Sequence, residues 1–349
     1  MRILFVIPHF FGAPKPGQPM AGGSHFDMVA RIAALNTAIV ALHRLFGPRR
    51  HAMAPDIPFP DRVGPTRVVD IVIIQIPGME LLDHIDIDPS CYVRENFSGD
   101  APMMEFEAQR ILRDRVGGYD YYGIIEDDIV LTDPTFFDKV QWFQDNFGPD
   151  TVLVPARYEM AHSGTPAAVL IDPTLPSELL EPFRRSGQQE MVSARWHGRP
   201  QDFSLAYNPH SAAHFLTDEH LRRWIRSPYF YDRDASWVGP MESAMDLSLG
   251  RTFDLYKPSA PDPLFLSVEH FGTRYSERSA PIGMRYGDSP ILDLAFRANS
   301  TNDELSRVKF YDALREQRSL KLELSTLRNS RTKLFKAYCR AVFSKLSRQ

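Results

Sequence analysis

The sequence predicts an α/β fold in its first 155 residues, and three observations support this prediction. Short apolar runs typical of buried strands alternate with longer segments of helical periodicity. Pro and Gly separate these segments at most of their boundaries. With 43% hydrophobic residues among 349, the chain can bury a sizeable core, which excludes wholesale disorder. We therefore expect an open sheet whose ligands bind at the carboxyl ends of its strands.

Local patterns place each element of this first half. The apolar run 3–7 is a buried strand closed by Pro8, and a helix covers about 27–45. The Pro-rich segment 47–65 is expected to be an ordered loop, because Pro lacks the N–H that helices and sheet ladders use. Further strands are expected at 68–76, 119–125 and 151–155, and further helices at 103–116 and from Pro134 onward.

The second half of the chain is less regular. Its Pro- and aromatic-rich stretch 257–281 is expected to be irregular, and helical sequence resumes at Asp303. We expect one large domain over residues 1–300, with halves 1–155 and 156–300, and C-terminal helices over 301–349. Helical pieces inside the second half are expected at 177–185, 210–226 and 240–249.

Charge is unevenly distributed along the chain. The net charge is −4, but residues 328–349 contain seven Lys or Arg and no Asp or Glu, so the remaining residues carry −11. The mildly acidic total argues against a nucleic-acid partner. Two cysteines cannot form a disulfide framework. No run approaches the roughly 18–20 apolar residues of a membrane span, and the first apolar run is too short for a secretory signal, so we expect a cytoplasmic protein.

Three adjacent carboxylates follow the strand at 119–125. Strand alternation is expected to place Glu126 and Asp128 on one face and Asp127 on the other. Such a cluster is costly unless water, hydrogen bonds or a cation offset its repulsion. Mg²⁺ and Mn²⁺ prefer oxygen ligands and often take one or two carboxylates plus substrate phosphates. The triplet is therefore a candidate metal site, with a solvated acidic turn as the alternative.

The segment from Tyr119 to Ile129 resembles the DxD-type site of GT-A fold glycosyltransferases, in the Glu-Asp-Asp form of the N-acetylglucosaminyltransferase I type. Residues 266–272 resemble the late strand whose His completes the metal site in many of these enzymes. Residues 239–246 resemble the acidic segment that opens the helix under the acceptor site. The resemblance covers about residues 1–280 and implies a metal-dependent GT-A glycosyltransferase, a Rossmann-like mixed sheet flanked by helices.

The resemblance implies a role for each matched residue. Asp128 would bind Mn²⁺ or Mg²⁺ directly, and His270 would be the second protein ligand. Glu126 would face the ribose or base of the nucleotide, and Asp127 would support the metal or its waters. The metal would bridge the diphosphate and stabilise the leaving group. Without the family match, His270 is equally well explained as an ordinary hydrogen-bonded histidine.

Glu242 and Asp246 are the candidate catalytic carboxylates. An inverting transfer needs a base within reach of the acceptor hydroxyl, and two residues four apart on a helix share a face. Ser243 stands where a second acid is common in the family, which leaves open which carboxylate acts and whether the anomeric centre is inverted. The alternative for Glu242 is a stabilising charge at a helix N-terminus.

Donor-binding residues are expected from two segments. Pro8, Phe10 and Phe11 follow the first strand and would cover the nucleotide base, with plain packing of the aromatic rings as the alternative. Arg94, Asn96, Arg110 and Arg113 precede the acidic triplet, and one of them, with Arg110 as the main candidate, is expected at the diphosphate, because guanidinium and phosphate geometries match. The alternative for Arg110 is an exposed helix charge.

Two other patterns are weaker. Asp83, Asp86 and Asp88 form a second DxD-like pattern, but Pro89 follows, so capping carboxylates in a turn are expected. His210 and His214 have the spacing of a zinc helix without an evident third ligand. Glycines 22–23 after the first strand also fit a GT-B glycosyltransferase, although no second Rossmann unit follows residue 200. A metal- or carbohydrate-binding protein without transfer chemistry is the alternative of a different class.

Residues 328–349 have the pattern of a basic amphipathic helix. Leu334, Tyr338, Val342 and Leu346 recur every four residues with basic residues between them. Such helices lie on anionic lipid, or pack on the protein body or a partner subunit through the same apolar stripe. The expected partners are thus a UDP- or GDP-sugar donor, a glycan or lipid-linked acceptor, and an anionic membrane surface that would hold the enzyme on the inner face of the membrane.

Overall fold

The computed structural model describes residues 1–12, 28–47, 68–160, 168–259, 262–273 and 275–276. All but the last two of these residues belong to one compact unit, Met1–Met160 with Ala167–Thr273. Several predictions fall outside the described residues: most of the loop 47–65, the domain boundary at 300, the helices after 303 and the tail 328–349. They stay predictions.

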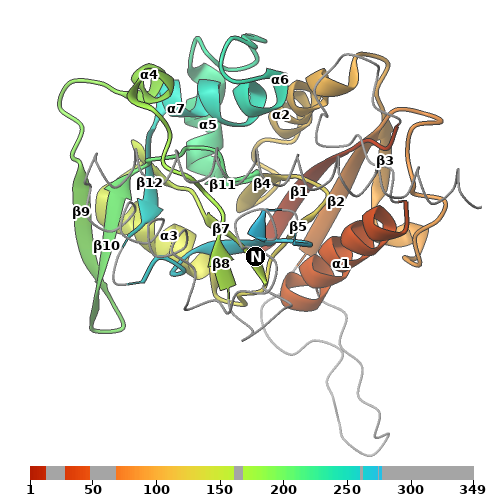
Figure 1. Ribbon diagram of the computed structural model, residues 1–349, viewed down its shortest axis with the longest axis horizontal. Helices are drawn as coiled ribbons and strands as arrows, with labels where there is room; N and C mark the ends of the chain where they lie inside the picture. Colours follow the sequence, from red (N-terminus) through yellow and green to blue (C-terminus); the bar gives the residue numbers. More distant parts are fainter. Residues whose placement is uncertain (13–27, 48–67, 161–167, 260–261, 274, 277–349) are drawn as a thin grey trace, which may run out of the picture. The chain divides into compact units, whose positions relative to one another are not determined.

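The predicted open sheet is present and has five strands in the order β11-β4-β1-β2-β3 (Figure 1). Neighbouring strands among β1–β4 run parallel, and β11 is antiparallel to β4. The first strand lies at the centre, as a continuous apolar run predicts, and it continues through Pro8 to His9 rather than ending there. Pairing with β4 ends at Val6, so Pro8 has a strand partner on the β2 side alone, where Ile74 lies opposite. The strands are β1 (Arg2–His9), β2 (Val68–Gln75), β3 (Val93–Asn96), β4 (Tyr121–Ile125) and β11 (Ala213–Thr217).

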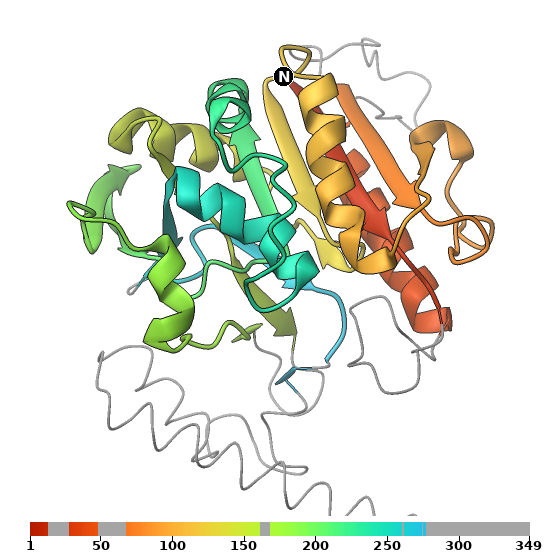
Figure 2. The ribbon, with the colours of Figure 1, turned by 90° about the horizontal axis from the view of Figure 1, so that it is seen from above.

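Helices cover both faces of this sheet (Figure 2). Because strand side chains alternate, Phe5 and Ile7 pack on the side of α1 and α3, whereas Leu4 and Val6 pack on the side of α2 and α5. The helices predicted at 27–45, at 103–116 and after Pro134 are confirmed with small shifts of their ends, whereas the helix predicted at 210–226 begins at Asp218. They are α1 (Met28–Phe46), α2 (Met104–Asp114), α3 (Phe136–Phe147) and α5 (Asp218–Arg226).

Phenylalanines fill the core on the α1 and α3 side. Phe5 of β1 and Phe137 of α3 lie 6.0 Å apart between ring centroids, and Phe136 and Phe215 lie 4.7 Å apart nearly edge to face. Gly123 of β4 lies beneath these rings, and a Cβ there would approach Phe215 to 3.0 Å and Phe5 to 3.1 Å. A larger residue at 123 would therefore push the aromatic cluster away from the sheet.

Helix α1 is long and apolar enough to cross a membrane by length and composition. In the compact unit it is a core helix, since Leu35, Ile39, Leu42 and Phe46 are 0–1% exposed in the cluster that includes β1 and β2. The same helix buries Arg31, a charged residue on its apolar side. That position is important for the site described below.

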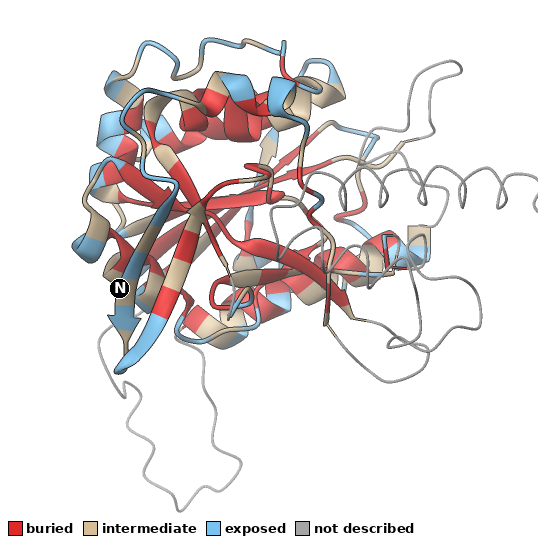
Figure 3. Cartoon of the chain, turned by 60° about the vertical axis from the view of Figure 1, so that its left-hand side comes forward, coloured by how far each residue is buried: buried red, intermediate tan, exposed pale blue. Residues whose placement is uncertain are grey.

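Two smaller sheets complete the compact unit, in the orders β5-β13-β7-β8 and β6-β12-β10-β9. The hairpin of β9 and β10 carries exposed residues, whereas the strands of the central sheet are mostly buried (Figure 3). The strand expected at 266–272 is present as β13. The strands are β5 (Ile129–Val130), β6 (Thr151–Leu153), β7 (Ala156–Met160), β8 (Ala168–Leu170), β9 (Met191–Trp196), β10 (Arg199–Leu205), β12 (Asp254–Pro258) and β13 (Ser267–His270).

The expected helix at 210–226 is wrong in its first half. Residues 213–217 form β11, because all five are buried and pair with β4. Thr217 then caps α5 by accepting a hydrogen bond from the His220 N–H. His210 and His214 therefore share no helix face, and burial lowers the pKa of His214 to about 3. His214 is a neutral core residue edge to face with Trp224, not a zinc ligand.

The helical piece expected at 177–185 is slightly shorter than predicted, and the one expected at 240–249 is present and extends to Thr252. Within its described residues, the stretch 257–281 is less irregular than its composition suggests, since β12 and β13 reach into it. The segment 240–252 is helical throughout but contains a π-turn. Its parts are α6 (Pro240–Glu242), the π-turn Ser243–Leu247 and α7 (Ser248–Thr252), and the piece near 177–185 is α4 (Ser177–Leu180) with a 3₁₀ turn at Glu181–Phe183.

Candidate functional site

The acidic triplet lies in a turn at the carboxyl end of β4, not on the strand itself. The Glu126 N–H donates to the Ala212 carbonyl (2.9 Å), and the Ile129 N–H donates back to the Glu126 carbonyl (3.1 Å). The expected alternation is therefore wrong. Asp127 and Asp128 both face Arg31, whereas Glu126 alone faces His210.

Arg31 offsets much of the repulsion within the triplet. It pairs with Asp127 and places Nη1 2.7 Å from Asp128 Oδ2. Burial acts to lower the pKa of Arg31, but Asp127 and Asp128 hold it above its ordinary value. His9 contacts the other Asp127 oxygen through Nδ1 and accepts from the Leu81 N–H at Nε2 (3.0 Å). The side chain of Asp127 is 2% exposed, so it serves to hold Arg31 and His9 in place.

His270 lies on the other side of Asp128. Glu159 holds its Nδ1 at 2.9 Å, and its Nε2 is 3.6 Å from Asp128 Oδ2. Burial acts to lower the pKa of His270, but the Glu159 hydrogen bond and Asp128 raise it overall. A carboxylate behind one ring nitrogen with the other nitrogen directed at a carboxylate is the outer-shell arrangement typical of metal-ligating histidines.

His270 and Asp128 are placed so that both could bind one divalent cation, most of whose ligands would come from substrate and water. Ligands about 2.0–2.1 Å from a common ion lie at most about 4 Å apart, and the 3.6 Å between His270 and Asp128 falls within that limit. Among the described residues, no group of three or more His, Cys, Asp or Glu side chains could hold a metal. The protein would thus supply two ligands, and substrate oxygens and waters the others. Arg31 is a competing cation on the same Asp128 oxygen.

His210 and Asp246 form a second polar pair beside the triplet. His210 Nδ1 is 2.7 Å from Asp246 Oδ2, and its Nε2 is 3.8 Å from Glu126 Oε1. Burial acts to lower the pKa of His210, but Asp246 raises it overall. Burial raises the pKa of Asp246 against the pull of His210. Asp246 itself is 2% exposed, so it contacts the site through its hydrogen bond to His210 and not directly.

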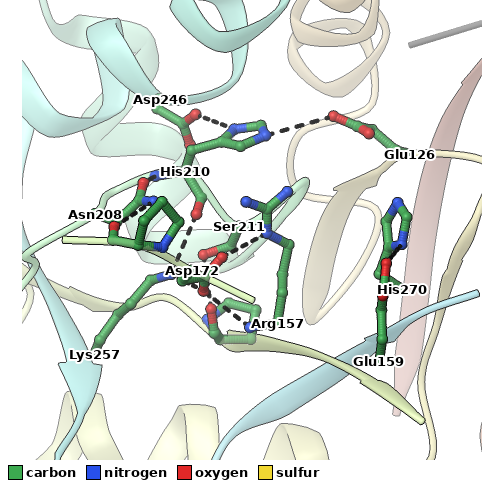
Figure 4. A network of polar contacts seen from close by, with 12 residues as sticks. Glu126, Arg157, Glu159, Asp172, Asn208, His210, Ser211, Asp246, Lys257 and His270 are labelled. Atoms are coloured by element: carbon green, nitrogen blue, oxygen red, sulfur yellow. Dashed lines mark hydrogen bonds and ion pairs between the residues drawn. The ribbon is translucent and has the colours of Figure 1, made fainter. Parts of the chain in front are cut away.

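Arg157 lies between these two pairs, and the buried carboxylate of Asp172 supports it from below (Figure 4). Asp172 accepts from Arg157 Nε (2.7 Å) and from its backbone N–H (3.0 Å), and it also binds Lys257. Lys257 in turn donates to the His210 carbonyl (3.2 Å). Arg157 and Glu159 share a face of β7 because they are two residues apart. The guanidinium points toward the space between His210, Glu126 and His270, and its positive charge acts to lower the pKa of Glu126.

A pocket opens to solvent next to the triplet. It is lined by Pro8 and Phe10, two of the predicted donor-loop residues, together with Glu126 and Asp127. Phe11 does not line this pocket, and its N–H binds the Met79 carbonyl instead. The remaining lining residues are Arg31, Ala101, Pro102, Met104, Glu105 and Met241.

Two other predicted site residues, Arg110 and Glu242, do not line this pocket. Arg110 lies on the outer side of α2, where Glu95, Glu107 and Asp114 all pair with it, and it does not line the pocket. Its side chain is 30% exposed, so Arg110 is a half-buried, ion-paired charge on the helix. Glu242 is half-buried at the end of α6, and its negative charge acts to raise the pKa of Asp246 and of Glu105.

The capping interpretation of the second acidic pattern also fits the structure. Asp88 caps the turn at Pro89–Cys91 by accepting from the Ser90 N–H, and Asp83 pairs with Arg94 at the surface.

Sequence reasoning missed His9, Arg31, Arg157 and Glu159. A signal existed for Arg31, because it falls on the apolar side of the 27–45 helix, in register with Leu35. Arg157 and Glu159 alternate after a predicted strand that proves to end at Leu153, and nothing local marks them.

No protein-family model matches the chain, and no curated protein matches it in sequence. Among solved structures, the chain is similar to mouse xyloside xylosyltransferase 1 in its apo form, with a TM-score of 0.33 and 11% sequence identity over 72% of this chain and 81% of that chain. A similarity at that level leaves the family open. The functional argument therefore depends on the residues of the site.

Proposed function

We propose that the protein is a glycosyltransferase that moves a sugar from a nucleotide-sugar donor to a glycan or lipid-linked acceptor. One observation carries the proposal: segments that lie far apart in the sequence come together at the carboxyl end of β4. The acidic triplet, His270 and the segment of Asp246 are linked through Asp128 and His210. The predicted donor residues Pro8 and Phe10 line the adjoining pocket.

The proposed donor site uses charge of both signs. His270 and Asp128 would hold Mn²⁺ or Mg²⁺ against the diphosphate, where the ion supplies Lewis-acid stabilisation of the leaving group. Arg157 is suited to the same negative charge, since its guanidinium points into this space from a buried carboxylate support (Figure 4). Positive charge fixed before the reaction costs no reorganisation when the leaving diphosphate forms.

The proposed acceptor chemistry uses the His210–Asp246 pair. Asp246 orients the ring through Nδ1, which directs Nε2 into the site (2.7 Å and 3.8 Å to Asp246 and Glu126). A histidine held in this way can accept the proton of an acceptor hydroxyl as its oxygen attacks the sugar. This assignment keeps the predicted importance of Asp246 but makes it a positioning residue.

The proposal is tested with a nucleotide-sugar hydrolysis panel in the presence of Mn²⁺ or Mg²⁺. The wild-type protein should hydrolyse at least one UDP- or GDP-sugar, and the Asp128→Ala variant should lose most of that activity. Asp86→Asn is a matched control, because Asp86 belongs to the second acidic pattern and is exposed. Full activity in Asp128→Ala would refute the metal-site assignment.

Ligand-induced stabilisation separates the alternatives. UDP or GDP should raise the melting temperature when Mn²⁺ or Mg²⁺ is present, by mass action on the folded state. A shift that needs no metal would favour the GT-B alternative. Binding without hydrolysis or transfer of any sugar would favour a non-catalytic binding protein.

A further inference from the structure

Glu105 is an acidic wall residue of the pocket that the proposed chemistry does not use. It lies in the first turn of α2, it is 4% exposed, and it lines the pocket together with Glu126 and Asp127. Its Oε2 atom is buried and has no hydrogen-bond partner among the residues that the structure describes. A buried polar atom in this state costs free energy unless a ligand satisfies it.

The surroundings of Glu105 favour its neutral form. Burial raises the pKa of Glu105 well above its usual value, and the nearby carboxylates of Glu126, Glu242 and Asp127 raise it further. Its own backbone N–H, at the start of the helix, acts in the opposite direction and is outweighed. A neutral carboxyl group presents one O–H donor beside one acceptor oxygen, whereas a carboxylate presents acceptors alone.

The rest of the pocket indicates the shape and polarity of what it would bind. Most of its wall is apolar, formed by Pro8, Phe10, Ala101, Pro102, Met104 and Met241. Among the lining residues that the structure describes, Arg31 is the one cation, and Asp127 and Asp128 already hold it. Its Nε atom is buried without a hydrogen-bond partner among the described residues and is a second polar group for a ligand. These walls suit a flat, uncharged ring with polar edges better than a phosphate.

Resting on the proposed function, we propose that Glu105 recognises the nucleobase of the donor, pairing its neutral carboxyl group with a base edge on which an N–H donor adjoins an acceptor. Uracil and guanine both present such an edge, so UDP and GDP share the required chemistry. The base lies against Phe10 and the methionines, and Glu105 fixes its orientation. Glu105 is thus a specificity-determining residue, and it takes no part in the transfer step.

The test compares two substitutions that differ in hydrogen bonding and are similar in size. Glu105→Gln keeps one donor beside one acceptor, and Glu105→Met removes both. Affinities for UDP and for GDP are measured by titration calorimetry with Mn²⁺ on the full chain. We expect E105M to bind about 10- to 100-fold more weakly than wild type, the loss typical when hydrogen bonds to a buried polar group are removed. E105Q should lose less than about threefold.

Glu107→Met is the matched control, since Glu107 is on the same helix, pairs with Arg110 and does not line the pocket. It should bind like wild type. If E105Q weakens binding as much as E105M, Glu105 acts as an ionised carboxylate and the inference is overturned. If E105M binds like wild type, Glu105 does not contact the base, and the inference fails while the proposed function stands. If the wild-type protein binds neither nucleotide, both fail together.

Discussion

Asp172 is expected to be one of the most sensitive residues of the protein. Its side chain is 1% exposed and compensates two buried cations, Lys257 (0%) and Arg157 (10%). Asp172→Asn keeps the shape of the side chain and removes its charge. Lys257 and Arg157 are then left without their counter-charge in a dry environment, which typically costs about 3–5 kcal/mol of unfolding free energy.

Lys257→Met should be milder than Asp172→Asn. It removes a cation, and Asp172 remains paired with Arg157 through hydrogen bonds of 2.7 and 3.0 Å. The expected loss is about 1–2 kcal/mol, for the hydrogen bonds that Lys257 makes to Asp172 and to the His210 carbonyl. The double variant should be less destabilised than the sum of the two single variants, because K257M removes one of the charges that D172N leaves unpaired.

Urea unfolding followed by tryptophan fluorescence measures these differences. For a chain of this size, the loss expected in D172N corresponds to a fall of about 4–7 °C in melting temperature. Asp83→Asn is the matched control, since Asp83 pairs with Arg94 at the surface with 69% of its side chain exposed, and it should change stability by less than about 1 kcal/mol. A loss below 1 kcal/mol in D172N, or strict additivity in the double variant, would refute the reasoning.

Three further outcomes are expected. Burial acts to raise the pKa of folded Asp172, but Lys257 and Arg157 lower it overall. The loss of stability in D172N should therefore have its largest value above about pH 4, the usual carboxyl pKa, and should shrink as the pH falls through the pKa of folded Asp172. A constant difference in urea titrations from pH 7 to pH 3 would contradict this linkage. Asp246→Asn should reduce kcat of sugar transfer roughly 100-fold and move its pH profile, because His210 loses its orienting carboxylate; a purely structural role would leave the pH profile in place. Gly250→Ala should destabilise the protein by about 1–3 kcal/mol despite the better helix propensity of Ala, because the new methyl group meets the Phe183 ring; an increase in melting temperature would show that Phe183 moves aside.

The parallel core of the fold was predictable because its signals are local. The runs at 3–7 and 68–76 are buried on both faces, and such strands are apolar throughout. Strand β11 was mistaken for part of a helix because its residues Ala213 to Thr217 are few and are all buried, which leaves no alternation to read. Strand β7 escaped because it contains Arg157 and Glu159, whose charges are tolerated only through partners far away in sequence.

The parts of the candidate site whose polar residues are neighbours in the sequence were predictable. The contacts between residues that are far apart in the sequence were not. The acidic triplet is recognisable because its three residues are adjacent in the sequence. The positive charge that offsets their repulsion comes from Arg31, which is 97 positions away from Asp128. The link between Asp246 and His210 spans 36 positions and was hidden by the mistaken helix. The sequence paired His210 with His214, four positions away, but His214 lies in the core and the partner of His210 is Asp246.

The π-turn at Ser243–Leu247 makes the site sensitive to chain length as well as to residue identity. A π-turn holds one residue more than an α-helical turn, and one residue corresponds to a rotation of about 100° around the helix axis. Deleting Leu247, the residue between Asp246 and α7, would restore a regular helix and rotate α7 relative to Asp246. Gln109 of α2 holds the Ala244 carbonyl (2.7 Å) on one side of the deletion, and α7 buries Leu249 on the other, so the shortened helix could not keep both the packing of α7 and the contact of Asp246 with His210.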